Sequence, residues 1–423
     1  MLTFPHLTVV PDGDDVVVGR ADTGVYAVFP ADGAALLGRL QAGASTDEAA
    51  GWYRERYGES ADMMDFLSTL RMLGFVHVSG EPSVTAPPGA PRGQLLGRLA
   101  FSWPAWLVYA GLCGYALYLL VRFPGLRPSP NDLFFTQSLL LTELGLLAAQ
   151  VLGGLHHEVW HALAGRRLGV RTRLRLGNRL YFLVFETDLT ELWSLPRRYR
   201  YLPLLAGMVG DLVWFSLATI LARTADTYGG PHGFPGTFLR ALALSALLRL
   251  AWQFQVHLRT DVYQVLVTAL RCVDLRGTTR ESLVNRVRRL LRRAAPYVEE
   301  RWYPRDRQVA RWYVFLAGAG YVVTLGMGGW IGVPFLAHMF TGVTAQLRGE
   351  KNALDAAPFP NASFVDGCLT LLINLAPMAT VVFIVLFRRR AHRTAAGEQA
   401  PDRPPRRNRR YLPAMSPAER NEE

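Results

Sequence analysis

The sequence predicts a mainly α-helical, polytopic membrane protein with about six transmembrane helices, preceded by a small α+β soluble domain. Half of its 423 residues are hydrophobic. Several apolar runs reach or approach the roughly 20 residues that a helix needs to cross a bilayer. Arginine is concentrated in alternate loops between these runs, which is the pattern that orients helices in a membrane.

The apolar runs define an expected transmembrane domain, residues 99–388. The six runs are 101–121, 133–164, 201–222, 237–257, 312–340 and 364–387. The loops 165–200 and 258–311 carry nine and thirteen arginines and ten follow Phe387, whereas the other loops carry one or two basic residues each. Because positively charged loops stay in the cytoplasm, we expect a multi-pass protein of the cell membrane with both termini in the cytoplasm.

The net charge of +12 is explained by these loops, since anionic lipid headgroups attract basic residues next to a membrane. We therefore expect contact with membrane lipids and no nucleic-acid partner. Residues 389–423 are rich in proline and arginine and are expected to form a disordered basic cytoplasmic tail. The three cysteines form no CxxC pair, which favours free thiols.

The amino-terminal residues 1–80 have the mixed composition of a soluble, winged-helix-like domain. Strands are expected at 16–19 and 24–29, helices from about Asp32, Ser45 and Asp62, and a last strand at 75–78. The opening sequence MLTFPHLTVVPDGDD has no basic region followed by an apolar core, so we expect this domain to stay in the cytoplasm. Residues 81–98 are rich in proline and glycine and predict a linker.

Residues 155–170, LHHEVWHALAGRRLGV, place ionisable side chains inside an apolar run. His157 and His161 are four residues apart, so on a helix they share a face and can bind one metal ion, with Glu158 beside them as a general base. Imidazole ligands and a catalytic role favour Zn²⁺. The alternative is that the histidines are polar residues satisfied in a helix bundle, but ionisable groups in a membrane are costly. His156 points off the shared face and is expected to be a neighbour.

A third ligand is expected on another element at the same membrane depth. The runs 133–164 and 237–257 both lead towards the cytoplasm, and QFQVHLRTDVYQVL follows the second. Asp261 is the expected third ligand because a carboxylate completes a His, His, acid set, and His257 is its competitor. Asp211, within LAGMVGDLVWF, is expected deeper in the membrane, where its carboxylate can orient a zinc-bound histidine.

At these residues the chain resembles the site-2 proteases, a family of intramembrane zinc metalloproteases. The resemblance covers roughly residues 133–266, and HEVWH is its specific part. It implies that His157, His161 and Asp261 bind zinc, that Glu158 is the general base, and that strands within 165–200 accept substrate by edge pairing. The family commonly has Asn and Pro before an Asp-Gly, whereas this chain has Gln255 and Val256 there and Val262 after the aspartate.

The amino-terminal domain is similar to PqqD-like peptide-binding domains, which recognise the leaders of ribosomally made, modified peptides. The similarity is carried by VYAVFPADGAALLGRLQAGAS, TDEAAGWYRERYG and MMDFLSTLRMLGFV. It implies a sheet edge that accepts an extended peptide as an added strand. The alternative is a generic winged-helix domain used for dimerisation.

Together these features predict a membrane-embedded zinc metalloendopeptidase that cleaves a peptide or membrane protein substrate in peptide maturation. The alternative is a non-proteolytic membrane scaffold that binds peptide and docks a transporter or a modifying enzyme. Replacing Glu158 by Gln separates the two, because only an enzyme needs the general base.

Overall fold

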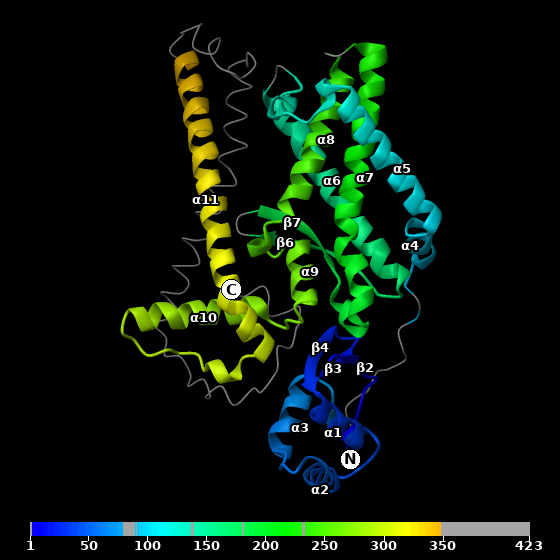
Figure 1. Cartoon of the computed structure of the whole chain (residues 1–423), viewed down its shortest axis with the longest axis vertical. Coiled ribbons are helices and arrows are strands. Elements are labelled where there is room, and N and C mark those ends of the chain that lie inside the picture. The colour runs from blue at the N-terminus through cyan, green and yellow to red at the C-terminus, as the bar shows by residue number, and fades with distance from the viewer. Residues whose placement is uncertain are drawn as a thin grey trace.

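A computed structural model of the chain describes residues 2–78, 89, 91–136, 139–179, 182–230 and 233–347. The described chain is mainly helical, with a small sheet region at the amino terminus and one hairpin between long helices. The long helices run roughly side by side, and the amino-terminal domain lies at one end of them (Figure 1). The expected apolar run 364–387, the tail 389–423 and Cys368 lie outside the described residues.

Four helices of the described chain are long and apolar enough to cross a membrane. They are α5 (Trp103–Arg122), α7 (Arg197–Gly229), α8 (Phe234–Trp252) and the Pro304–Gly326 part of α11 (Pro304–Leu347). These helices cover four of the six predicted runs. The run 133–164 forms α6 (Leu139–Arg167), which is not one of these four helices.

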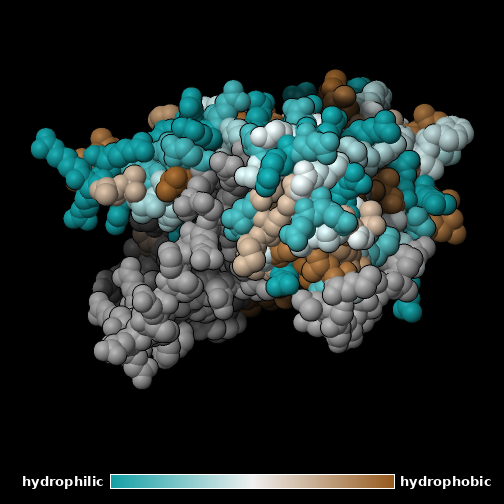
Figure 2. Space-filling view, turned by 90° about the horizontal axis from the view of Figure 1, so that it is seen from below, coloured by the Kyte–Doolittle hydropathy of each residue, from teal (hydrophilic) through white to brown (hydrophobic). Residues whose placement is uncertain are grey.

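The distribution of exposed side chains agrees with a membrane protein. The face at the amino-terminal end is mostly hydrophilic, with scattered apolar patches (Figure 2). By contrast, α5 and the 304–326 part of α11 expose large apolar side chains: Trp103, Leu107, Val108, Leu117, Val121, Phe315, Val322, Val323 and Leu325. A soluble protein rarely exposes so continuous an apolar surface.

The amino-terminal domain is built from two small sheets and three helices. Strands β2 (Thr8–Asp12), β3 (Asp15–Arg20) and β4 (Val25–Pro30) form an antiparallel sheet in that order, and β1 (Leu2–Thr3) pairs with β5 (His77–Val78). Helices α1 (Ala31–Gln41), α2 (Thr46–Tyr57) and α3 (Met63–Met72) follow β4. The predicted β3, β4 and helices are confirmed. The predicted strand 75–78 is limited to His77–Val78, and β1 and β2 were not predicted.

Local sequence signals explain where these helices begin. Ser45 and Glu48 form a reciprocal capping box at the start of α2, and Asp62 accepts a hydrogen bond from the backbone of Asp65 at the start of α3. The two-residue β1 is too short to show any periodicity. Strand β2 contains Pro11, which disfavours a strand prediction because proline is confined to sheet edges.

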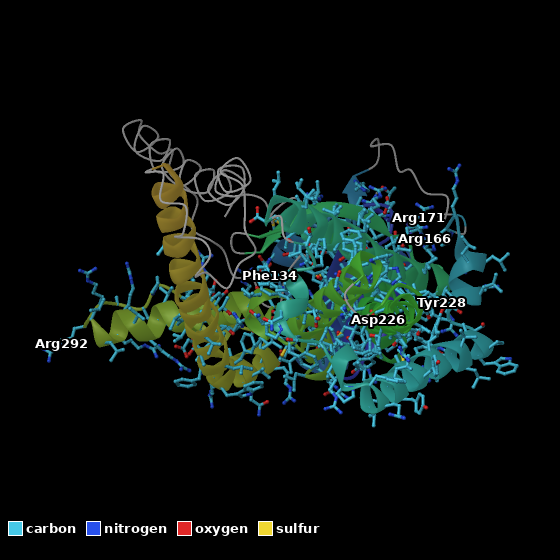
Figure 3. The ribbon with its side chains drawn as sticks, turned by 90° about the horizontal axis from the view of Figure 1, so that it is seen from above. Phe134, Arg166, Arg171, Asp226, Tyr228 and Arg292 are labelled. Carbon is cyan, nitrogen blue, oxygen red and sulfur yellow. The ribbon has the colours of Figure 1, made fainter. Side chains whose placement is uncertain are left out.

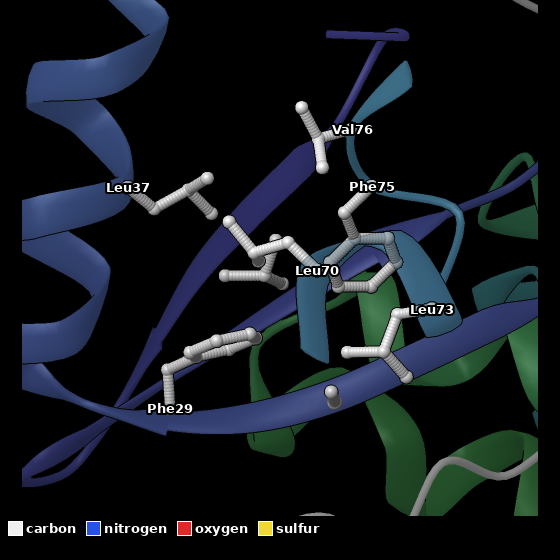
Figure 4. Close-up of a cluster of buried hydrophobic side chains, with 8 residues drawn as sticks. Phe29, Leu37, Leu70, Leu73, Phe75 and Val76 are labelled. Carbon is white, nitrogen blue, oxygen red and sulfur yellow. The ribbon is translucent and has the colours of Figure 1, made fainter. Parts of the chain in front are cut away.

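The core of this domain joins the sheet to the helices, as Figure 4 shows. Its buried side chains are Val18, Ala27, Phe29, Leu37, Leu70, Leu73, Phe75 and Val76. Full burial of a side chain such as Leu70 or Phe75 stabilises the fold by about 1.5–3 kcal/mol. The domain therefore has a hydrophobic core of its own.

The predicted linker ends earlier than expected. Helix α4 (Gln94–Ala100) begins inside the predicted linker 81–98, so the prediction is wrong for residues 94–98. Gly97 packs directly on α6, where a Cβ atom would lie 2.3 Å from the carbonyl oxygen of Leu163. This tertiary contact stabilises a helix in a segment whose composition predicts none.

The hairpin after α6 and the short helices after α8 lie beside the half of the long helices that is nearer to the amino-terminal domain (Figure 1). A hairpin of β6 (Arg173–Arg179) and β7 (Phe182–Asp188) follows α6, and the short helix η3 (Thr190–Ser194) leads into α7. After α8 come η4 (Val256–Leu258), α9 (Asp261–Ala269) and α10 (Leu275–Leu290). Helix α10 extends sideways from the bundle and leads to Arg292 at its far end (Figure 3).

A candidate metal centre

The two histidines of HEVWH lie side by side on α6 and are almost fully buried. His157 is 4% exposed and His161 is 3% exposed, and their Nε2 atoms are 3.1 Å apart. The opposite ring nitrogens are both occupied: His157 Nδ1 lies 2.7 Å from Asp211 Oδ2, and His161 Nδ1 lies 2.6 Å from the carbonyl oxygen of Pro203. Because both acceptors take a proton from Nδ1, each Nε2 lone pair is left free for a metal ion.

Asp261, the third ligand expected from the sequence, lies beside both imidazoles. Its Oδ2 atom is 2.9 Å from His157 Nε2 and 3.1 Å from His161 Nε2. Ligand atoms at 2.0–2.1 Å from a tetrahedral zinc ion are about 3.3 Å apart. The three atoms are therefore spaced within a few tenths of an ångström of what zinc requires.

The helix opposite these ligands leaves room at the same point. Gly207 of α7 faces both imidazoles, and a Cβ atom there would lie 2.4 Å from each Nε2. Any side chain at this position would occupy the space beside the ligand atoms. The donor set and this clearance together fit a bound divalent zinc ion.

The helix is interrupted after α8, and this interruption places Asp261 beside the imidazoles. Gln253 ends the helix, and the chain passes through η4 and Arg259, whose φ is 59°. Thr260 is fully buried and donates from Oγ1 to the carbonyl oxygen of Gln253 at 2.6 Å. Helix α9 then begins with the Asp261 carboxylate in its first turn, at the end of the helix where a negative charge is favoured.

The side chain of Gln253 also belongs to the centre. Its Oε1 accepts a hydrogen bond from the backbone N–H of Asp261 at 3.2 Å, and its Nε2 lies 3.4 Å from His157 Nε2. Gln253 was not predicted from the sequence, because a glutamine at a helix end carries no motif.

Glu158 lies beside the two histidines and faces the β6–β7 hairpin. One of its carboxylate oxygens lies within 4.8 Å of a ring nitrogen of each histidine. Its Oε2 atom accepts the backbone N–H of Thr187 at 2.6 Å, and its backbone carbonyl accepts the Thr187 hydroxyl at 3.0 Å. The hairpin therefore holds the glutamate next to the ligand set.

A cavity of about 210 Å³ opens at this point. Besides Glu158, His161 and Asp261, it is lined by residues of the hairpin, of η3, of α7 and of α9: Arg175, Leu176, Gly177, Glu186, Thr187, Asp188, Leu192, Trp193, Arg200, Leu204, Gln264, Val267 and Thr268. The ligand set, the glutamate and the hairpin thus share one cavity.

Asp211 lies next to the centre, and it is fully buried. Besides its contact with His157 Nδ1, it accepts the Nε–H of Arg249 through Oδ1 at 2.7 Å. The expected contact with a histidine is thus present. Arg249 was not predicted, because the sequence pattern of an apolar helix does not indicate which residue its arginine contacts.

The other two histidines considered lie outside the ligand set. His257 Nε2 is 2.9 Å from Thr324 Oγ1 of α11, and its ring packs against Tyr321. His156 Nε2 is 3.1 Å from the carbonyl oxygen of Gly210, and its ring packs against Trp160 and Trp214. The competitor of Asp261 therefore contacts α11, and His156 is a neighbour, as the helix geometry indicated.

The amino-terminal domain docks against the wall of the cavity. Asp12 forms an ion pair with Arg197, and its other oxygen lies 3.8 Å from Arg200. A buried apolar cluster of Val10, Val17, Tyr26, Val28 and Val273 packs with Trp193 and Tyr303. Since Trp193 and Arg200 also line the cavity, the docking surface and the cavity share residues.

The turn between α6 and the hairpin is held by one acidic side chain. Glu191 of η3 accepts the backbone N–H of Arg171 at 2.8 Å. Burial is the main effect on this carboxyl group and raises the pKa of Glu191 above its usual value.

Comparisons of this chain with family models, with curated proteins and with solved structures found no match.

Proposed function

We propose that the chain is a membrane-embedded zinc metalloendopeptidase of the site-2 protease type. The observation that carries the proposal is the convergence of three ligand atoms, His157 Nε2, His161 Nε2 and Asp261 Oδ2, at 2.9–3.1 Å from one another. Two imidazoles and a carboxylate are a ligand set of catalytic zinc sites, which keep a fourth position open. The nearby Glu158 carboxylate is the group that hydrolysis needs in addition.

In this proposal each residue has a separate task. Zinc, when bound, supplies Lewis acidity towards a carbonyl oxygen and makes water nucleophilic near neutral pH. Glu158 accepts the proton of the attacking water and returns it to the amine of the leaving fragment. The Thr187 N–H holds the Glu158 carboxylate in place while it does so. The outer edge of the hairpin accepts an extended substrate by strand pairing.

The amino-terminal domain acts in this proposal as a PqqD-like, winged-helix-like peptide-recognition module. Strands β2 and β4 are the two edges of its three-stranded sheet, and a leader peptide adds to such an edge as a further strand. Docking through Asp12, Arg197 and Arg200 keeps the captured peptide near the cavity. The resulting reaction is maturation of a ribosomally made, modified peptide.

The proposed arrangement in the cell membrane follows the distribution of arginine. Six spans within residues 99–388 put both termini and the loops 165–200 and 258–311 in the cytoplasm. This topology places the centre near the cytoplasmic face, since HEVWH lies in the half of α6 that precedes the arginine-rich loop 165–200. A cytoplasmic recognition domain then lies on the same side of the membrane as the site.

Metal content tests the ligand set directly. Elemental analysis of detergent-purified full-length protein is expected to find about one zinc per chain in the wild type and to find it lost in His157→Ala and Asp261→Ala. His257→Ala is the matched control and keeps its zinc, because His257 contacts Thr324 instead. Wild-type protein without zinc after metal-supplemented preparation would exclude the proposal.

Peptide cleavage tests the reaction. The protein is incubated with a proteome-derived peptide library, and new termini are read by mass spectrometry. Glu158→Gln is expected to keep its zinc and to produce none of the termini that the wild type produces. If the wild type holds zinc but yields no termini that depend on Glu158, the chain is a metal-containing scaffold and the peptidase proposal fails.

A further inference from the structure

A chain of four polar side chains leads from α6 through the two neighbouring helices and back to α6. His157 contacts Asp211 of α7, Asp211 accepts from Arg249 of α8, and Arg249 donates from Nη1 to Gln150 Oε1 of α6 at 3.2 Å. Gln150 precedes His157 by seven residues, so it lies two turns away on the same side of α6. The network therefore begins and ends on α6, the helix that carries the two histidines.

The guanidinium of Arg249 packs closely against α6. Gly153 of α6 faces it, and a Cβ atom there would lie 2.3 Å from Arg249 Nη1. The Arg249 side chain is 11% exposed and Asp211 is 0% exposed, so water does not compete for their hydrogen bond. The planar guanidinium, held at Nε and Nη1, keeps the carboxylate from rotating.

We propose that Arg249 is a positioning residue of the metal centre, which fixes the Asp211 carboxylate so that its Oδ2 atom orients His157 for zinc. The inference rests on the proposed function, because it concerns the same ligand set. Asp211 has one oxygen for each partner: Arg249 holds Oδ1, and Oδ2 is left for the imidazole. A histidine held in this way points its Nε2 lone pair at the metal without further loss of side-chain entropy on binding.

A purely structural role would make Arg249 a charge partner that joins α7 to α8. The chain contains such a pair elsewhere on the same two helices. Arg240 of α8 contacts Asp226 of α7 at 2.6 and 2.8 Å, and its side chain is also 11% exposed. Asp226, which Figure 3 labels, lies 15 residues after Asp211 in the sequence and close to the end of α7. Arg240 is thus a matched control.

The experiment compares Arg249→Lys and Arg249→Gln with Arg240→Lys and Arg240→Gln in full-length protein. Zinc affinity is measured by competition with a chromogenic chelator, and the visible spectrum of the Co²⁺-substituted protein reports the ligand geometry. We expect the Arg249 variants to bind zinc 10–100-fold more weakly and to change the cobalt spectrum. We expect the Arg240 variants to lower thermal stability alone.

Gly153→Ala tests the same positioning role without changing any charged residue. The added methyl group displaces the Arg249 guanidinium while it favours the helix, and it is expected to weaken zinc binding as well. Gly154→Ala is its control, because the added Cβ atom meets Phe185 only at an ordinary 3.4 Å. This pair decides the question even if the Arg249 variants fail to fold.

The outcomes separate the two proposals. Wild-type zinc affinity and cobalt spectrum in Arg249→Lys, or in Gly153→Ala if the lysine variant does not fold, would overturn the positioning role and leave the metal centre standing. Equal losses of zinc affinity in the Arg249 and Arg240 variants would also overturn it. A wild-type protein that binds neither metal would remove the proposed function and the positioning role together.

Discussion

Thr187 of β7 binds Glu158 of α6 twice, through its backbone N–H at 2.6 Å and through its hydroxyl at 3.0 Å. The first bond ends on the Glu158 carboxylate and the second on its backbone carbonyl. The β6–β7 hairpin, which follows HEVWH in the sequence, thus holds the side chain that is proposed as the general base. Thr187 is 8% exposed, so these bonds are shielded from water.

The two bonds are expected to contribute differently to turnover. Thr187→Pro removes the N–H that binds the carboxylate, and a hydrogen bond to a charged group contributes about 1.5–3 kcal/mol. We expect turnover to fall by roughly 10–100-fold at unchanged zinc content. Thr187→Val keeps the N–H and is the control, for which a much smaller loss is expected. Equal turnover in the two variants, measured with a peptide substrate identified in the library, would contradict this role.

A methyl group at Gly207 is expected to abolish metal binding. Its Cβ atom would lie 2.4 Å from both His157 Nε2 and His161 Nε2, so the imidazoles must move apart. Gly229, at the end of the same helix, has no atom within 4 Å of its Cβ position, and Gly229→Ala is the control. Elemental analysis is expected to find no zinc in Gly207→Ala and about one zinc per chain in Gly229→Ala. Full zinc content in Gly207→Ala would place the metal elsewhere.

Removal of the metal is expected to destabilise the folded protein. A ligand at 100 times its Kd stabilises the native state by about 2.7 kcal/mol, which for a chain of this size corresponds to roughly 3–5 °C in Tm. Differential scanning fluorimetry with and without a chelator measures the shift. His157→Ala is expected to show no dependence on zinc, whereas His257→Ala behaves as the wild type. A chelator that lowers the Tm of His157→Ala equally would indicate a metal bound by other residues.

Docking of the amino-terminal domain is expected to depend on Arg197. Its ion pair with the buried Asp12 is lost in Arg197→Ala, and loss of a charged hydrogen bond costs about 1.5–3 kcal/mol. Hydrogen–deuterium exchange is expected to rise in the segments 8–12 and 190–195, which meet at the docking surface, with zinc content unchanged. Arg198→Ala is the control, because Arg198 lies over the Tyr199 ring instead. Unchanged exchange in Arg197→Ala would show that the apolar cluster alone holds the domain.

Helix periodicity accounts for the part of the centre that was predicted from the sequence. His157, Glu158 and His161 lie within five residues of one helix, and the angle per residue alone puts the two histidines on one face. The starts of α2 and α3 were predicted for a similar reason, because Ser45 and Asp62 bind backbone groups only three residues away. Contacts of this kind depend on local geometry and require no knowledge of the fold.

The remaining contacts depend on how the helices pack. Asp261 is 104 residues from His157, and the sequence left His257 as its competitor until the break after α8 placed only the aspartate beside the imidazoles. Three contacting residues were not predicted: Arg249, Gln253 and Thr187. Each of them contacts a residue that lies on a different helix or strand. Apolar helices can bury a similar apolar surface area in several rotations about their axes, because the hydrophobic effect is not directional. Only the tertiary structure selects the rotation that brings these polar groups together.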